Sequence, residues 1–467
     1  MNDNLLDLTA LKAELTQLRN DARRYRDEAR RLRTETRHMM LTAQLEAVQM
    51  PAEKSKWVID GIPTPDGFYA YYGAGGDSYL LYRPSSGRGD YTAYLTALEA
   101  AGFVRHDGGE LGKVAFACYY DDRAVIHVSH ASCDNVLRVV VDHRNATALA
   151  PTEPICDGAP NSAEPRLVLF GDHLYDLYDC GMGYIFRLSD GTFVIIDGGM
   201  PDPAELPECF YGRLRELAGE GKIVISAWIF THAHSDHTRV FVRLSELYAD
   251  RLEVRRVIHN FPGTLMQMGG GHEGWCRNEV RYVEESMARL SPRPLFIRAH
   301  TGQRFDFPGL SVEMLFTLDD FKQPFFPDNF NATSLIFRVT AERQTFMFLG
   351  DTDPTGCEVI VNRFGEALKS DVVQVAHHGY WGGTKEVYDA IRPEIVLWPC
   401  PLFDPRASRN FEPRLSNPDF SPVTREMIRN YARAVYVQWK GTDILPLPLT
   451  GEDGVTLMAE DDPTIEK

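Results

Sequence analysis

The chain has 467 residues, more than one hydrophobic core usually supports, so two or three domains are expected. Hydrophobic residues make up 44% of the chain and charged residues 25%, which is typical of a globular, water-soluble protein. The formal net charge is −17, whereas a protein that holds nucleic acid through its phosphates needs a basic surface. The composition therefore argues against an obligatory nucleic-acid partner.

The cysteines and the first residues indicate the compartment. Eight cysteines are scattered along the chain without a Cys-x-x-Cys pair, which favours free thiols in a reducing compartment over a disulfide framework. The start, MNDNLLDLTALKAEL, lacks the basic segment and apolar centre of a signal peptide. No apolar run reaches the roughly 20 residues of a membrane helix. We therefore expect a cytoplasmic protein with no membrane span.

Residues 1–50 have the pattern of a coiled coil. Apolar or small side chains recur in alternating steps of three and four, and no Gly or Pro interrupts them before Pro51. An amphipathic helix packed on its own domain is the alternative interpretation, but so narrow an apolar strip suits a partner helix better. The pattern predicts a coiled-coil helix through which the chain forms a homo-oligomer.

Residues 52–150 are predicted to form a small α+β domain. The segments FYAYYG, SYLLYR, KVAFACYY, AVIHVSH and VLRVVVD are strand-like, and DYTAYLTALEAAGF is a predicted helix that ends at Gly102. His127 and His130 lie in or beside these strands without metal-ligand spacing, so we interpret them as structural or surface residues. The Pro-rich polar stretch 150–165 predicts a linker.

From Arg166 onward, predicted strands and helices alternate. The strand-like segments RLVLF, GYIFRL, TFVIID, KIVISAWIF and VRRVIH are separated by helical patterns near 204–217, after His237 and near 278–290. This alternation indicates an α/β fold in which helices cover the sheets. We expect this domain to span residues 166–450 and an acidic tail to follow at 451–467.

The stretch WIFTHAHSDHTRVF, residues 228–241, places three histidines and an aspartate directly after a predicted buried strand. His232 and His234 are two residues apart, so in extended backbone they point the same way and can share a metal ion. Asp236 and His237 follow at the turn into the next helix, where they can reach a second ion. These residues are too few to fill the coordination shell of a metal ion. The motif therefore predicts a catalytic metal site, most simply for zinc, in which one position is left for water. The alternative is a polar helix-capping turn.

This motif resembles the H-x-H-x-D-H signature of the metallo-β-lactamase-fold hydrolases. Four further stretches agree with that family in order: FVIIDGG with Asp197, DNFNATSLIFRV with Asn331, FMFLGDTD with Asp351, and VVQVAHHGYWGG with His377 and His378. The combination of N-x-x-S-L, L-G-D and H-H-G is most similar to one branch of the family. That branch contains the hydrolase-like domain of bacterial competence (DNA-uptake) proteins and related phosphoesterases.

The resemblance implies an αββα sandwich with a metal centre. Asp351 would bridge two metal ions, and Asp197 and Asn331 would support the centre from outside the ligand shell. One of His377 and His378 would be the last ligand. The implied metal-binding set is His232, His234, Asp236, His237, Asp351, His377 and His378.

One position departs from the family pattern. Many members supply a third histidine to the first metal ion between the H-x-H-x-D-H helix and the bridging aspartate, but here that place reads VEMLFTLDD. Of His259, His272 and His300, which lie in this interval, His259 is the best candidate for a substitute, although an ordinary histidine at a strand end is the better interpretation. The number of metal ions, one or two, is left open.

The implied function is that of a metal-dependent hydrolase that uses a metal-activated hydroxide, with zinc as the expected ion and manganese or iron as alternatives. Asp236 or Asp351 would accept a proton from the attacking water, and whichever of His377 and His378 is not a ligand would donate to the leaving group or to the oxyanion. Phosphodiester cleavage on a small or lipid-like substrate is the first hypothesis. Acyl-bond hydrolysis of a lactone, thioester or β-lactam is the second. A coiled-coil scaffold protein with an inactive hydrolase domain is the third.

Overall fold

The computed structural model divides the chain into two compact units, residues 1–50 and 51–467. The predicted coiled coil lies outside the described residues, and so does the acidic tail beyond residue 452. Among the helices within the described ranges, none has both the length and the hydrophobicity that a membrane span requires. The structure describes residues 59–64, 66–72, 78–171, 181–200, 206–263, 276–321, 330–399, 421–437 and 442–452.

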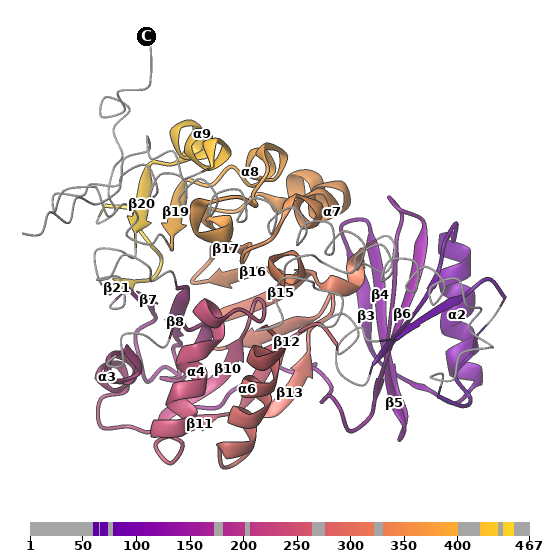
Figure 1. Ribbon diagram of the computed structural model, residues 1–467, viewed down its shortest axis with the longest axis horizontal. Coiled ribbons are helices and arrows are strands. Elements are labelled where there is room, and N and C mark those ends of the chain that lie inside the picture. The colour runs from indigo at the N-terminus through magenta and orange to yellow at the C-terminus, as the bar shows by residue number, and fades with distance from the viewer. Residues whose placement is uncertain are drawn as a thin grey trace, which may run out of the picture. The chain divides into compact units, whose positions relative to one another are not determined.

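The N-terminal part of the larger unit is an antiparallel sheet of six strands in the order β1-β2-β6-β5-β4-β3 (Figure 1). The edge strand β3, VRHDGGEL, was not among the predicted strands because it is polar, largely exposed and contains two glycines. Backbone pairing with β4 makes it a strand nonetheless. The strands are β1 (Tyr69–Tyr72), β2 (Tyr79–Arg83), β3 (Val104–Leu111), β4 (Val114–Tyr120), β5 (Ala124–Ala131) and β6 (Val136–His143).

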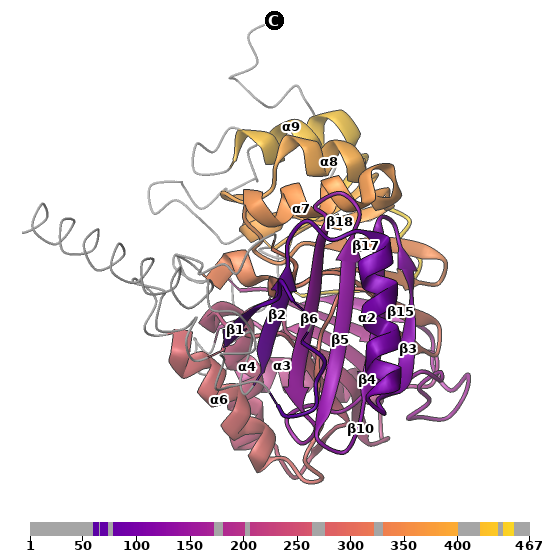
Figure 2. The same cartoon turned by 90° about the vertical axis from the view of Figure 1, so that its right-hand side faces the viewer.

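Helix α2 (Arg88–Ala100) covers one face of this sheet (Figure 2). Tyr91, Tyr94 and Leu98 recur at helical spacing and are buried against the sheet. Gly102, which follows the helix with a φ of +91°, allows the chain to reverse there. The predicted helix and its end are therefore found in the structure, within a domain whose boundaries, 52 and 150, stay a prediction.

The rest of the unit contains two further sheets. The first follows the order β13-β12-β10-β9-β8-β7-β21, with β11 also paired to β10, and the second the order β14-β15-β16-β17-β18-β19-β20. The first sheet consists of β7 (Arg166–Leu169), β8 (Gly183–Arg187), β9 (Phe193–Asp197), β10 (Ile223–Ile229), β11 (Leu252–Val254), β12 (Arg256–His259), β13 (Leu295–Arg298) and β21 (Asp443–Pro446). The second consists of β14 (Arg304–Phe307), β15 (Leu310–Phe316), β16 (Ile336–Ala341), β17 (Gln344–Phe348), β18 (Val372–Gln374), β19 (Ile395–Trp398) and β20 (Ala434–Val437).

These two sheets face each other across an aromatic core, and helices cover their outer faces (Figure 1). Tyr184 and Phe186 of the first sheet pack edge-on against Phe348 and Phe346 of the second, with ring centroids 5.3 and 5.7 Å apart. This layering confirms the mixed α/β fold predicted from the alternation after Arg166. The covering helices are α3 (Leu206–Ala218), α4 (Ser235–Leu247) and α6 (Cys276–Arg289) on one side, and α7 (Pro354–Phe364), α8 (Lys385–Ile391) and α9 (Pro422–Tyr431) on the other.

Parallel strands at the centre of both sheets determine where the polar motifs emerge. β9, β10 and β12 run parallel, as do β17, β18 and β19, and they are buried on both faces, which explains their nearly unbroken apolar sequences. The carboxyl ends of parallel strands meet at one edge of a sheet, where α/β proteins place their ligand sites. The predicted metal ligands all follow strands at such ends, whereas Asn331 lies in a 3-10 turn (Phe330–Thr333) before β16.

The six-stranded sheet contacts the sandwich through buried charged groups. Arg298 at the end of β13 donates from Nε to Asp142 of β6 over 2.6 Å, and both side chains are almost fully buried. His300 lies 3.5 Å from Asp142 and 3.1 Å from Asp319, and its ring stacks on His127 of β5 at 3.7 Å. His127 is thus a structural residue, as predicted.

Two further buried arginines lie at the same contact. Arg138 of β6 donates from Nε and Nη2 to the Phe321 carbonyl oxygen over 3.1 and 3.0 Å. Arg363 of α7 forms an ion pair with Asp320 over 2.6 Å. The pKa of Asp320 is lowered, because Arg363 outweighs the opposing effect of burial. Asp320 and Phe321 are therefore held by two arginines from different elements.

We expect Asp142→Asn to lower the free energy of unfolding by about 3 kcal/mol, because it leaves the Arg298 guanidinium buried without its counter-charge. Burial alone would raise the pKa of Asp142, but Arg298 and His300 lower it, so its stabilising effect is present at neutral pH and declines as the pH falls through that lowered pKa. The exposed pair of Asp306 and Arg304 supplies the control: Asp306→Asn should cost less than about 1 kcal/mol. Urea unfolding measures both, and similar losses would contradict the role assigned to Asp142.

Candidate metal centre

The histidine motif lies between the end of β10 and the first turn of α4. His234, in extended backbone with φ −106° and ψ 152°, is the residue that caps the helix. Asp236 and His237 lie in the first helical turn, because the helix begins at Ser235, three residues earlier than predicted. Because the strand is buried and the helix starts at once, His232, His234 and His237 are all buried.

Asp197 orients two of these histidines although it lies outside the ligand groups. It ends β9 with a left-handed φ of +52°, and its carboxylate accepts hydrogen bonds from Thr231 N, Thr231 Oγ1 and His237 Nδ1, each over 2.8 Å. Since the Thr231 hydroxyl proton goes to Asp197, His232 Nδ1 donates to Thr231 Oγ1 over 3.0 Å. Both histidines therefore carry their proton on Nδ1 and direct Nε2 toward the centre.

Asp351 and His378 approach from the opposite sheet. Asp351 follows β17, and His378 follows β18 with a left-handed φ of +54°. His378 Nδ1 donates to the Pro399 carbonyl oxygen over 2.8 Å, so its Nε2 faces Asp236 at 3.1 Å and Asp351 at 3.4 Å. Such unfavourable backbone conformations are typical of functional sites, where the surrounding structure holds them.

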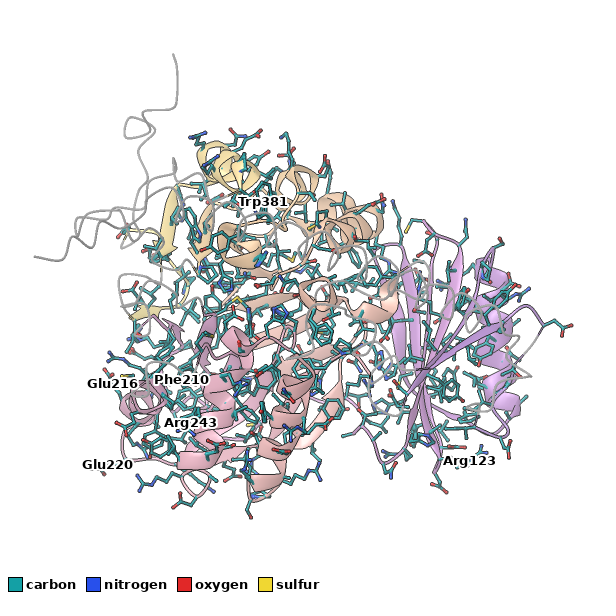
Figure 3. The ribbon with its side chains drawn as sticks, viewed as in Figure 1. Arg123, Phe210, Glu216, Glu220, Arg243 and Trp381 are labelled. Carbon is teal, nitrogen blue, oxygen red and sulfur yellow. The ribbon has the colours of Figure 1, made fainter. Side chains whose placement is uncertain are left out.

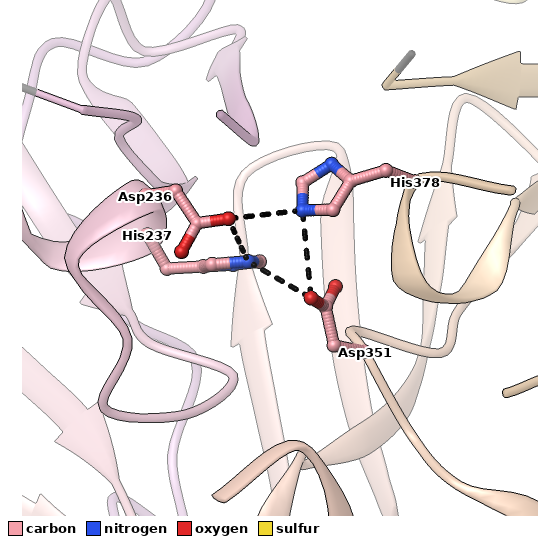
Figure 4. Close-up of side chains that lie close together, drawn as sticks. All are labelled: Asp236, His237, Asp351 and His378. Atoms are coloured by element: carbon pink, nitrogen blue, oxygen red, sulfur yellow. Dashed lines mark hydrogen bonds and ion pairs between the residues drawn. The ribbon is translucent and has the colours of Figure 1, made fainter. Parts of the chain in front are cut away.

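The side chains form two groups of potential ligands that share Asp351. Within each group the ligand atoms lie within 4.8 Å of one another. Figure 4 shows the first group as a closed ring, in which His237 Nε2 lies 3.4 Å from Asp351 Oδ2 and 3.6 Å from Asp236 Oδ2. The first group is Asp236, His237, Asp351 and His378, and the second is His232, His234 and Asp351.

The residues fit a divalent cation. His232 Nε2, His237 Nε2 and Asp351 Oδ1 are buried and have no hydrogen-bond partner within the described part of the chain. Leaving such groups unsatisfied costs about 1–3 kcal/mol each. A cation in the first group would satisfy His237 and a cation in the second would satisfy His232, and Asp351 belongs to both groups. Imidazole nitrogens combined with carboxylate oxygens are the ligands that zinc and similar ions prefer.

The electrostatics agree with that fit. Burial alone would raise the pKa values of Asp236 and Asp351, but histidines outweigh it and hold both well below their usual range. Burial alone would lower the pKa values of His237 and His378, but the two carboxylates raise both, that of His378 to about 10. The carboxylates thus attract positive charge into a buried place, and a divalent ion can replace the two histidine protons.

Besides Asp197, three predicted candidates lie outside both ligand groups. His377 donates from Nδ1 to the Trp381 carbonyl oxygen over 2.5 Å, and its Nε2 lies 3.2 Å from Asn331 Nδ2 and 3.9 Å from Asp351 Oδ2. Asn331 is buried beside it. His259 stacks on Phe261 at 3.8 Å, in the position of an ordinary strand-end histidine. In the described ranges, no histidine occupies the place of the expected third ligand.

Comparison with known proteins agrees with this geometry. Residues 178–397 match the family described as the metallo-beta-lactamase superfamily. The chain contains a metallo-beta-lactamase superfamily domain. The matched segment includes both ligand groups and Asp197. A search of curated proteins found no match.

Solved structures of low sequence identity also resemble the chain. The metallo-beta-lactamase fold protein YhfI from Bacillus subtilis is 12% identical, with a TM-score of 0.35, over 59% of this chain and 96% of that one. A Cronobacter sakazakii metallo-beta-lactamase with a HARLDQ motif is 19% identical, with a TM-score of 0.27, over 49% of this chain and 81% of that one. The assignment of the domain to its superfamily rests on the match of residues 178–397 and on the ligand geometry, not on these structures.

The centre of the metallo-beta-lactamase domain opens into a pocket of about 710 Å³. Asn331, Asp351 and His377 lie at its polar side, and Trp381, Pro354 and Pro422 form apolar walls. Sequence reasoning missed Trp381 and Thr231. Thr231 lies directly between a buried strand and the first histidine of the motif. That position could have indicated a hydroxyl group that orients a metal ligand.

The two ligand groups should differ in affinity, because one offers four protein ligands and the other three. We expect His378→Ala to abolish tight binding of the first zinc ion and His232→Ala to retain it while weakening the second. Metal analysis after dialysis against a competing chelator measures this, with the exposed His143→Ala as the control. Loss of the tightly bound ion from His232→Ala alone would reverse the assignment.

Proposed function

We propose that this domain is a metal-dependent hydrolase and that its first substrate class is phosphodiesters. The observation that supports this most directly is Asp351, shared between two ligand groups at the floor of an open pocket. Two neighbouring cations are the usual device for stabilising both the attacking and the leaving oxygen of a phosphoryl displacement. The similarity of the N-x-x-S-L, L-G-D and H-H-G motifs to the competence-protein and phosphoesterase branch supports the same class.

A bound divalent cation would lower the pKa of a water molecule toward 7 and would offset negative charge on the substrate. The chain's own residues supply position and protons. Asp197 and Thr231 hold the imidazoles of His237 and His232 in one orientation, which limits reorganisation during the reaction. The buried surroundings of Asp351 exclude bulk water from one side.

His377 is the chain's candidate for proton transfer. Its side chain is 29% exposed, lines the pocket and lies outside both ligand groups. The Trp381 carbonyl oxygen holds Nδ1–H, so Nε2 faces the pocket and is the atom that gains or loses the proton. In hydrolysis, the attacking water loses a proton to the Asp236 carboxylate, and its oxygen forms the new bond to phosphorus. The bond to the leaving oxygen breaks, and that oxygen takes a proton from Nε2–H of protonated His377.

Acyl-bond hydrolysis is the second candidate, because the same ligand set can act on a carbonyl. The scaffold alternative predicts an inactive centre. The complete ligand group of Asp236, His237, Asp351 and His378 argues against it. We also propose a cytoplasmic location, which the free thiols of Cys118, Cys133, Cys156 and Cys357 support.

The zinc-loaded protein should hydrolyse bis(p-nitrophenyl) phosphate faster than p-nitrophenyl acetate, relative to the uncatalysed rates. Asp351→Ala should abolish this activity, because both ligand groups lose their shared carboxylate, whereas His259→Ala should retain most of it. Release of p-nitrophenolate measures both. Activity on the acetate alone would favour the acyl alternative, and zinc binding without activity on either substrate would favour the scaffold alternative.

His377→Gln should separate proton transfer from metal binding. We expect kcat to fall about 100-fold for a dialkyl phosphodiester, whose leaving alkoxide needs a proton. For a p-nitrophenyl ester, whose leaving group needs no proton, kcat should fall only about 10-fold. Zinc content should equal that of the wild type. His143→Gln, on an exposed histidine, is the matched control. Equal losses on both substrates would mean that His377 does not protonate the leaving group.

A further inference from the structure

Trp381 is exposed beside the metal centre in a way that folding does not explain. Its side chain is 70% exposed, and it is the only aromatic residue among the large exposed hydrophobic side chains of the described ranges. Trp228 and Trp398, by contrast, are completely buried. An apolar surface of this size costs free energy in water, so an exposed tryptophan at a pocket is typical of a binding surface. Figure 3 labels it beside helices α8 and α9.

The backbone that carries Trp381 is firmly held. A Cβ atom on Gly382 would lie 2.3 Å from the Thr352 carbonyl oxygen, and one on Gly383 would lie 2.5 Å from the Tyr388 hydroxyl oxygen. The loop therefore packs directly on its neighbours and needs both glycines there. Cys357 Sγ contacts the Gly382 carbonyl oxygen over 3.7 Å. The indole is thus presented to the pocket by a fixed loop.

Trp381 is also next to the reacting groups. Its carbonyl oxygen accepts the Nδ1 proton of His377 over 2.5 Å, and His377 Nε2 lies 3.9 Å from Asp351. Trp381 lines the same pocket as Pro354, Pro422 and Val423, while Thr384 and Lys385 lie at its polar side. A volume of about 710 Å³ is that of a site for a compact small molecule.

We propose that Trp381 determines specificity by stacking against an aromatic ring of the substrate, one that lies next to the scissile group. This inference rests on the proposed hydrolase function and extends it to aryl-bearing or nucleobase-bearing esters. A flat, rigid indole favours a flat partner, because stacking buries both faces at little cost in conformational entropy. Pro354, Pro422 and Val423 line the pocket beside the indole, so a ring that stacks on Trp381 can also contact apolar side chains.

Equilibrium binding tests the inference without turnover. The zinc-loaded full chain is titrated by calorimetry with methylphosphonate, phenylphosphonate and octylphosphonate, which share the anionic group and differ in the attached group. We expect the wild type to bind phenylphosphonate about tenfold more tightly than methylphosphonate. Trp381→Ala should reduce this preference to within about twofold, and Trp381→Phe should restore most of it. Leu295→Ala, which truncates another exposed apolar side chain, should leave the preference intact.

The outcomes separate the two proposals. Loss of the phenyl preference in Trp381→Ala supports the inference even if no phosphodiester is hydrolysed, a result that would overturn only the proposed reaction. Equal binding of phenylphosphonate and methylphosphonate by the wild type overturns the inference, and so does a preference that survives in Trp381→Ala. Tighter binding of octylphosphonate than of phenylphosphonate also overturns it, because the wall would then accept an alkyl chain. Binding of none of the three by the zinc-loaded chain contradicts it as well.

Discussion

Two carboxylates, the buried Asp351 and the half-buried Asp236, set the constraint on which the rest of the centre depends. They approach from different sheets and meet within reach of the same histidines, where little water can solvate their charge. Positive charge has to be supplied locally, either by protonated histidines or by a cation. Everything around them, from the left-handed backbone at His378 to the tautomer of His237, directs donor atoms toward that place.

The sequence predicted the parts of this centre that local structure determines. Buried parallel strands are nearly all apolar, so the polar residue after each strand stands out, and Asp197, His232 and Asp351 were identified in this way. Which of His377 and His378 faces the ligands was not predictable, because it depends on two consecutive left-handed φ values and on the Pro399 carbonyl oxygen, 21 residues away. Pattern alone does not specify such backbone conformations.

The contact between the six-stranded sheet and the sandwich could not be predicted from the sequence either. Asp142 and Arg298 are 156 residues apart, and each lies in a segment that reads as an ordinary strand. Their pairing depends on the packing of two separately predicted domains. The same holds for Arg138 of β6, whose guanidinium donates to the carbonyl oxygen of Phe321, 183 residues away.

Substrate recognition and proton transfer are joined in one short loop. The Trp381 carbonyl oxygen determines which nitrogen of His377 carries the proton, while the indole of the same residue forms the pocket wall. A substrate that stacks on the indole presses on a backbone that is already fixed by Gly382 and Gly383, so binding cannot easily displace His377. Because the loop is held in place before substrate arrives, the orientation of the proton carrier costs little during the reaction. This coupling explains why an exposed tryptophan lies beside a histidine that belongs to neither ligand group.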